Sequence, residues 1–385
     1  MNEPVKIGIV AGEASGDMLG ADLIRHLRSH FPEAQFSGLG GDAMLAEGFT
    51  SLFDMDRLSI MGFVEPLKRL PELLRMRKAL VAHFLASDAD LVVGIDSPDF
   101  NLGLELRLRK RGLLTAHYVS PSVWAWRQGR IKTIARAVDR MIALFPFESD
   151  FYRRHQVPAT FVGHPLADRI PMVIDTERAR RELGLNDAML LAVMPGSRGS
   201  EIRYMGDLFL QACVRLHREN PSLRFVMPSA SEPRHRELSE LLAKYPELPI
   251  TLVRGKSHQV MAASDAVLLT SGTTALEAML FKKPMVVAYR MGGLGFWLLA
   301  RLVKTAYISL PNLIAGKPLV PELIQDEANV DNLVLAVGSM LYDEEKREML
   351  KASFSELHRS LKLDAGASAA VELAAMIRKR RGERV

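Results

Sequence analysis

Two carboxylates in the first half of the chain stand where a buried strand is expected to end. Asp96 closes the apolar run of residues 90–95, and Asp99 lies three residues further on. Parallel strands present their carboxyl ends at one edge of a sheet, where ligands bind, so a strand-tip carboxylate can serve as a general base. We expect Asp96 to be the better base, whereas Asp99 has the pattern of a helix cap.

Two turns in the second half of the chain have the composition of phosphate-binding loops. They are Gly196-Ser197-Arg198 and Ser271-Gly272-Thr273-Thr274, and each follows an apolar run. Glycine and hydroxyl residues before a helix direct backbone N–H groups and a positive dipole end at one point, and an arginine adds donors matched to phosphate oxygens. We expect a diphosphate site here, with the hydroxyls of the second turn capping the next helix.

Two further residues are candidates for contacts to a nucleotide. Glu277 lies about one turn into the helix expected after Thr274, where a carboxylate can accept hydrogen bonds from ribose hydroxyls. Asn312, in the segment Ser309-Leu-Pro-Asn312, could contact uracil or phosphate. The alternatives are a solvated helical glutamate and an ordinary Pro-Asn turn.

No metal or other cofactor is expected from the acidic pairs. The pairs are Asp54 with Asp56 and Asp88 with Asp90. Such pairs can hold a cation that bridges a nucleotide diphosphate. However, Asp88 and Asp90 precede their strand and so face the wrong edge of the sheet, and no recognisable strand follows Asp56.

Apolar runs with the composition of buried strands alternate with helical segments along the chain. The expected strands are residues 5–10, 35–39, 90–96, 115–119, 140–144 and 159–163, then 190–194, 224–227, 250–253, 266–269 and 285–288. This alternation is typical of α/β proteins with parallel, doubly wound sheets. At 385 residues the chain is too long for one core. We expect two Rossmann-like domains, residues 1–168 and 169–350, with the ligand site in the cleft between them.

The balance of charged residues indicates which kinds of molecule the protein could bind. The 50 Lys and Arg exceed the 45 Asp and Glu by only five, which suits an anionic ligand or a membrane surface but is too little to indicate nucleic acid. The single Cys213 excludes an internal disulfide framework, and its apolar neighbours indicate a buried thiol. We expect a cytoplasmic protein, because the N-terminus has no signal-peptide layout and no run reaches transmembrane length.

Six segments, in the same order, resemble lipid-A-disaccharide synthases. They are residues 10–17, 94–101, 118–127, 195–198, 271–277 and 302–312, of which the tryptophan-containing segment 118–127 is the most specific. The resemblance implies a GT-B glycosyltransferase of lipid A biosynthesis, known from bacteria with lipopolysaccharide. It implies transfer of 2,3-diacylglucosamine from UDP to 2,3-diacylglucosamine 1-phosphate (lipid X), with a new β-1,6 linkage, inversion at the sugar and release of UDP.

The resemblance also implies that residues 351–385 form a helical segment that packs back on the first domain. From the charges alone, the basic end at residues 378–384 is expected to be solvated and frayed. A homodimer is compatible with the sequence. Two rival functions stay open: a UDP-sugar epimerase or other lipid-linked-sugar transferase on the same fold, and a non-catalytic protein that binds nucleotide sugars or lipids.

An apolar stretch in the first domain is the candidate membrane contact. Its large side chains are Phe63, Val64, Leu67, Leu70, Leu73 and Leu74, and Lys and Arg lie among them. Because acyl-sugar substrates reside in a bilayer, we expect a peripheral location on the cytoplasmic face of the inner membrane. The alternative is packing on the first sheet, which we expect in part for residues 73–81. Pro66 and Pro71 are expected to break the stretch into short pieces.

Overall fold

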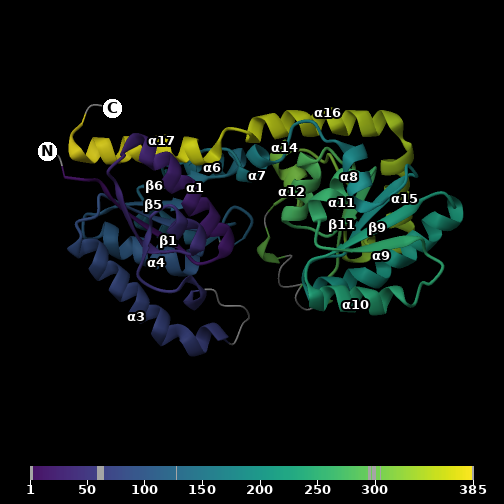
Figure 1. Cartoon of the computed structure of the whole chain (residues 1–385), viewed down its shortest axis with the longest axis horizontal. Coiled ribbons are helices and arrows are strands. Elements are labelled where there is room, and N and C mark those ends of the chain that lie inside the picture. Colours follow the sequence, from purple (N-terminus) through teal and green to yellow (C-terminus); the bar gives the residue numbers. More distant parts are fainter. Residues whose placement is uncertain are drawn as a thin grey trace. The chain divides into compact units, whose positions relative to one another are not determined.

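The computed structural model describes residues 3–58, 65–126, 128–293, 296, 301–303 and 305–383, and only the backbone of residues 65–68. Two compact units are present (Figure 1): Met1–Asp168 with Leu361–Val385, and Arg169–Ser360. The first boundary lies where the sequence placed it. The C-terminal segment joins the first unit from Leu361 and not from residue 351, because most of helix α16 (Glu344–Leu361) belongs to the second unit.

The first unit is built on a parallel sheet of seven strands. The strands are β1 (Lys6–Ala11), β2 (Gln35–Leu39), β3 (Thr50–Ser51), β4 (Leu91–Ile95), β5 (Leu114–Tyr118), β6 (Arg140–Ala143) and β7 (Ala159–Phe161). Their order is β3-β2-β1-β4-β5-β6-β7. The strand order reverses between β1 and β4, so the carboxyl ends of these two strands form the switch point at which doubly wound sheets bind ligands.

Helices cover both faces of this sheet, and alternate strand residues supply the two cores. Ile7 and Ile9 pack with α1 (Ala14–His30) and α17 (Ala365–Arg381). Val10, which follows Ile9 and points to the opposite face, packs instead with α3 (Glu65–Ala86) and α4 (Pro98–Arg109). The remaining helices of the unit are α2 (Asp42–Ala46), α5 (Ile131–Ala137), α6 (Pro146–Arg154) and α7 (Pro165–Arg169), with short 3₁₀ turns at Met55–Arg57 and Gln128–Arg130.

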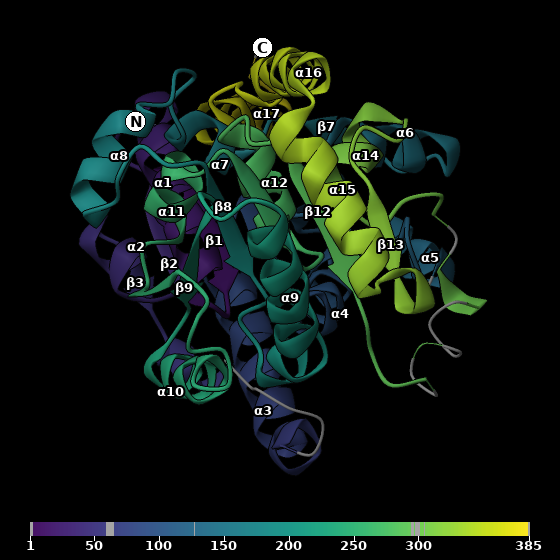
Figure 2. The ribbon, with the colours of Figure 1, turned by 90° about the vertical axis from the view of Figure 1, so that its right-hand side faces the viewer.

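The second unit repeats the arrangement with six parallel strands. They are β8 (Leu190–Met194), β9 (Arg224–Ser229), β10 (Ile250–Arg254), β11 (Ala266–Leu269), β12 (Met285–Tyr289) and β13 (Glu322–Ile324), in the order β10-β9-β8-β11-β12-β13. The helices among its described residues are α8 (Thr176–Leu183), α9 (Gly199–Glu219), α10 (Glu232–Leu242), α11 (Ser257–Ala263), α12 (Thr273–Leu280), α14 (Leu310–Ala315), α15 (Val330–Tyr342) and α16, with a 3₁₀ turn at Gln325–Glu327. Figure 2 shows α9 and α15 side by side. The switch point here lies between β8 and β11.

The prediction of two parallel α/β domains is confirmed, and every expected strand is present. Cys213 is fully buried as expected, and burial raises the pKa of its thiol. The prediction that prolines break residues 65–81 is wrong, because α3 runs unbroken from Glu65 to Ala86. Pro66 lies in the first turn, where no N–H bond is needed, and burial of Met76, Leu80 and Phe84 offsets the bond lost at Pro71.

The C-terminal end of α17 is docked and not frayed. The guanidinium of Arg381 binds both carboxylate oxygens of Asp90, at 2.7 and 2.8 Å, and also the carbonyl of Glu3. Arg380 donates to the carbonyl of Gly112 at 2.8 Å. Asp90 in turn accepts the N–H of Lys6 at 2.8 Å, so this acid ties the start of β1 to the last helix.

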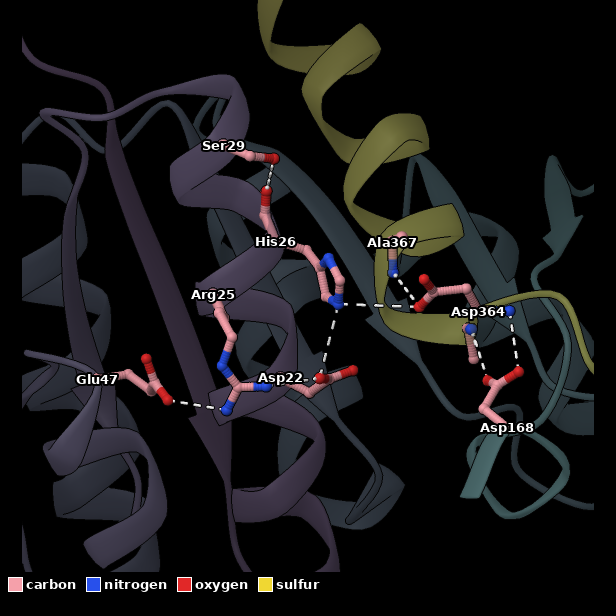
Figure 3. Close-up of polar contacts among 9 residues, drawn as sticks. Asp22, Arg25, His26, Ser29, Glu47, Asp168, Asp364 and Ala367 are labelled. Carbon is pink, nitrogen blue, oxygen red and sulfur yellow. Dashed lines mark hydrogen bonds and ion pairs between the residues drawn. The ribbon is translucent and has the colours of Figure 1, made fainter. Parts of the chain in front are cut away.

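The other end of α17 is fixed by carboxylates (Figure 3). Asp168 accepts the backbone N–H groups of Asp364 and Ala365 at 2.9 and 2.8 Å. His26 of α1 lies between Asp22 and Asp364, with Nε2 at 3.7 and 3.8 Å from their carboxylate oxygens. The segment that leaves the first unit and the segment that returns to it are therefore joined.

Candidate functional site

Asp96 occupies a strained turn at the switch point of the first sheet. Asp96 and Ser97 both have left-handed backbone conformations, with φ of 50° and 44°. The N–H of Asp96 donates to Tyr118 of the neighbouring strand at 2.9 Å, which fixes the turn against β5. Its side chain is half-buried, and the carboxylate has no hydrogen-bond or ion-pair partner among the described residues. Two successive non-glycine residues in this conformation indicate strain of the kind that accumulates at functional sites.

Neighbouring residues hold this turn in place. The amide of Asn101, fully buried in α4, donates to the carbonyls of Val10, Ile95 and Asp96 at 3.2, 3.2 and 2.8 Å. It thereby ties the ends of β1 and β4 together. Val119, directly after β5, has a φ of 76°, which is rare for a β-branched residue. Strained backbone thus marks the ends of two adjacent strands.

Asp99 is a weaker candidate than Asp96. It lies in the first turn of α4, but the helix cap is Ser97, so the expectation that Asp99 is the cap is wrong. Its carboxylate is exposed and forms an ion pair with Arg130, and its carbonyl accepts Arg77 at 3.0 Å. A carboxylate that is already paired with an arginine is a poor proton acceptor.

A buried carboxylate at the ends of β5 and β6 was not predicted. Glu148 accepts the N–H groups of Leu144 and Phe145, both at 3.1 Å, and the indole N–H of Trp124 at 3.2 Å. Burial raises the pKa of Glu148 to about 8, although these three donors oppose the shift. Glu148 therefore orients Trp124, within the most specific motif of the sequence. The available signal was a glutamate at the third position of a helix that begins with proline.

The second unit contains a cavity of about 270 Å³ at its switch point. The lining residues come from the ends of β8, β9 and β10, from the start of α11 and from α12: Met194, Gly196, Ser197, Pro228, Ser229, Ala230, Gly255, Ser257, Thr274 and Glu277. Four of them, Gly196, Ser197, Thr274 and Glu277, are predicted site residues. Those after β9 and β10 were missed, because the sequence alone does not show the strand order β10-β9-β8.

The nest of N–H groups expected at the Gly196-Ser197-Arg198 turn is already filled. Oε2 of Glu201 accepts the N–H groups of Ser197 and Arg198 at 2.9 and 3.1 Å, which is a capping-box arrangement. The side chain of Arg198 is 80% exposed and binds Oε1 of Glu201 at 3.2 Å. The prediction that this turn offers free N–H groups to a diphosphate is therefore wrong.

The start of α12 keeps its capacity for an anion. Its cap residue is Gly272, with a φ of 127°, and no side chain caps the helix. The expected hydroxyl cap is thus wrong, and Ser271 instead donates to the carbonyl of Ile308 at 3.4 Å. Thr273 begins the helix and Thr274 faces the cavity. An uncapped helix N-terminus beside a cavity suits a phosphate group.

Glu277 lies in the cavity wall, one turn above this helix start. Its Oε1 lies 3.2 Å from Nε2 of His258, and its side chain is 19% exposed. The carboxylate is therefore fixed in position and reachable from the cavity. The alternative of a freely solvated helical glutamate does not fit this placement.

Asn312 has a structural role in place of the expected ligand contact. Its amide nitrogen donates to Val320 and Glu322, and its oxygen accepts the N–H groups of Leu319 and Val320, all at 2.8–2.9 Å. The side chain is buried and its hydrogen-bonding capacity is fully used. The alternative of a Pro-Asn turn is also wrong, because Asn312 lies inside α14, and residues 319–322 close over its side chain.

The candidate membrane residues are placed in part. Phe63 and Val64 lie outside the described residues, as does the side chain of Leu67. Leu70 and Leu74 are 50% and 45% exposed on α3, whereas Leu73 packs against the core below the helix. None of the described helices is long and apolar enough to cross a bilayer.

Among the described residues, no cluster of three or more His, Cys, Asp or Glu side chains could hold a metal ion.

Comparisons with known proteins identify the family. The family model of lipid-A-disaccharide synthetase matches residues 7–376. The lipid-A-disaccharide synthase of Saccharophagus degradans is 49% identical over 384 residues, and that of Pseudomonas aeruginosa strain LESB58 is 51% identical over 381; each alignment covers at least 99% of both chains. The UDP-GlcNAc 2-epimerase of Neisseria meningitidis bound to UDP-GlcNAc shares the fold, with a TM-score of 0.62 at 14% identity over 97% of this chain and all of that one. The chain belongs to the lipid-A-disaccharide synthetase family and is a glycosyltransferase that forms the disaccharide of lipid A.

Proposed function

We propose that the donor is UDP-2,3-diacylglucosamine and that the acceptor is 2,3-diacylglucosamine 1-phosphate. The product would be a β-1,6-linked disaccharide 1-phosphate, formed with inversion at the donor sugar and release of UDP. The observation that carries the chemistry is the carboxylate of Asp96 on its strained turn, which has no partner among the described residues. In this proposal Asp96 removes the proton of the acceptor hydroxyl as that hydroxyl attacks the sugar carbon.

The donor nucleotide would occupy the cavity of the second unit. The uncapped start of α12 would receive the diphosphate, and Glu277 would accept hydrogen bonds from the ribose hydroxyls. Charge on the leaving UDP would be stabilised by these N–H groups and the helix dipole. We therefore infer that the reaction needs no metal ion.

Product analysis tests this proposal. The protein, incubated with both acyl-sugar substrates, is expected to yield the disaccharide and UDP in equal amounts, and excess EDTA should leave the rate unchanged. An epimerase would instead convert the UDP-sugar in the absence of acceptor, and a binding protein would give no turnover. Activity lost in EDTA and restored by Mg²⁺ would contradict the metal-independent mechanism.

Replacing Glu277 tests the donor cavity separately. Glu277→Ala is expected to weaken UDP binding by about 1.5–3 kcal/mol, the contribution of a hydrogen bond to a charged group. Titration calorimetry with UDP measures this, and the KM for the acceptor should change little. Glu240→Ala removes an exposed glutamate of α10 and serves as the control. Equal UDP affinity in wild type and Glu277→Ala would remove Glu277 from the nucleotide site.

The apolar face of α3 supports a location at the membrane surface. We infer that the protein is peripheral on the cytoplasmic face of the inner membrane, since both substrates carry acyl chains that reside in the bilayer. Leu70 and Leu74 are half-exposed at the N-terminal end of a helix rich in Lys and Arg. Such a surface suits the boundary between headgroups and acyl chains.

A further inference from the structure

Helices α3 and α4 enclose a groove of about 280 Å³ on the surface of the first unit. It is lined by two apolar and four cationic side chains: Leu74, Arg77, Lys78 and Val81 from α3, Arg107 from α4, and Arg111 just after α4. Apart from the side chain of Leu74, the proposed function assigns nothing to this groove. Four of its six lining side chains are positively charged, so the groove needs negative charge nearby.

The cations of the groove have no carboxylate partner in the described part of the chain. The three arginines donate to backbone carbonyls only: Arg77 to Asp99 at 3.0 Å, Arg107 to Gly103 at 2.6 Å and Arg111 to Arg107 at 3.3 Å. Neither they nor Lys78 form an ion pair with any described residue. Carbonyls position a guanidinium without neutralising it, so the groove keeps its positive charge.

Arg77 is the fixed member of this set. It is half-buried, with Cζ 4.9 Å from the ring centre of Phe100, and its buried Nε has no partner among the described residues. Gly103 permits this approach, because a Cβ there would lie 3.0 Å from Cζ of Arg77. Burial, together with the charge of Arg107, lowers the pKa of Arg77. Holding like charges close together in a partly buried groove is unfavourable unless an anion joins them.

The opposite side of α3 differs from the groove, because a carboxylate lies beside its arginines. There, Arg57 and Arg69 share the carboxylate of Glu72, at 2.7 and 3.2 Å. On that side the protein itself therefore supplies a carboxylate beside its arginines. The side that faces α4 has no such carboxylate among the described residues, so its counter-charge would come from an anion outside the protein.

An apolar stripe leads into the groove. Residues 70, 74, 78 and 81 lie on one face of α3, since they are spaced by three or four positions. Leu70 and Leu74 are half-exposed at the N-terminal end of this face, and the cations follow in the next turns. A ligand that matches both parts carries a phosphate next to acyl chains.

We propose that the groove binds the phosphate of an anionic phospholipid headgroup, while the leucine stripe contacts the acyl region. Arg77 is the preset donor, and the exposed side chains of Arg107 and Arg111 close on the phosphate oxygens, for which the guanidinium fork is suited. This inference rests on the proposed membrane location. It adds a defined headgroup site and a requirement for anionic lipid.

The test is sedimentation of the full-length protein with vesicles of phosphatidylcholine, with and without phosphatidylglycerol. R107Q/R111Q is expected to bind anionic vesicles about 10- to 30-fold more weakly than wild type, at about 1 kcal/mol per cation near the surface. Its binding to neutral vesicles and its KM for the acceptor in detergent micelles should stay unchanged. Both side chains are exposed, so the variant should keep its melting temperature. R236Q/K244Q, which removes the same charge from exposed positions of the second unit, should behave as wild type.

Each contrary outcome overturns a different statement. If wild type sediments with neither kind of vesicle, the membrane location is wrong and the headgroup site is wrong with it. If wild type binds anionic vesicles and R107Q/R111Q binds them equally well, the site is wrong and the location stands. If the variant binds vesicles normally but has a raised KM for the acceptor in micelles, the phosphate bound in the groove belongs to the substrate and not to a phospholipid.

Discussion

Asp96→Asn should lower turnover by about 10²–10⁴-fold, the usual contribution of a general base. The amide has nearly the shape of the carboxylate but cannot accept the proton of the acceptor hydroxyl. Asparagine also tolerates the left-handed conformation that residue 96 adopts, so the turn and the fold should be kept. Initial rates with saturating substrates measure the effect, and UDP binding should be unaffected, because the cavity proposed for the nucleotide is lined by residues of the second unit.

Asp99→Asn is the matched control for this experiment. It makes the same chemical change three residues away, on an exposed carboxylate that is paired with Arg130. We expect it to keep most of the wild-type rate. Near-normal turnover in Asp96→Asn, with a large loss in Asp99→Asn, would transfer the role of base to Asp99.

Glu105→Ala should destabilise the first unit by about 3–5 kcal/mol, the cost of removing one partner from a buried, hydrogen-bonded pair of ionisable groups. Glu105 and His117 are both fully buried, with Oε1 and Nδ1 2.8 Å apart. Burial raises the pKa of Glu105, and the neighbouring His117 opposes that shift. Removing the carboxyl leaves the imidazole without this partner and opens a cavity between α4 and β5. Urea unfolding followed by circular dichroism measures the loss.

Two companion variants show whether the pair itself is responsible. Glu105→Gln keeps an acceptor for His117 and should cost less, about 1–2 kcal/mol. The double variant E105L/H117L replaces the pair by apolar groups and should recover much of the stability lost in Glu105→Ala. An unchanged urea midpoint for Glu105→Ala would show that the pair contributes nothing to stability.

The parts of the fold that follow from local pattern could be predicted from sequence. Continuous apolar runs identify buried parallel strands, and strand-end position singled out Asp96. The two strands that were missed, β3 and β13, span only two and three residues, too few to form a pattern. The long α3 was missed because the expectation considered only the local cost of a proline inside a helix. Burial of Phe84 and Leu80, which the sequence alone does not show, outweighs that cost.

Site residues whose roles depend on distant partners were beyond the sequence. Asn312 has the type and position of a ligand contact, yet residues 319–322 use its whole amide. Arg381 belongs to a run of charge that predicts a solvated end, but Asp90, far away in sequence, binds it. The role of Glu201 could have been predicted from the sequence. It stands three residues after Arg198, which is the spacing of a capping box, and its carboxylate accepts the N–H of Ser197.

The division of the first unit into two chain segments bears on its biosynthesis. On the ribosome, residues 1–168 emerge before the whole second unit, and α17 comes last. Until then the apolar residues of α1 that pack with α17, among them Leu23 and Leu27, lack their cover. The nascent chain thus carries exposed hydrophobic surface through the synthesis of almost two hundred residues, a situation in which chains aggregate or recruit chaperones. The second unit is therefore synthesised completely before the first unit can be completed. Any premature stop before residue 361 leaves the first unit without α17.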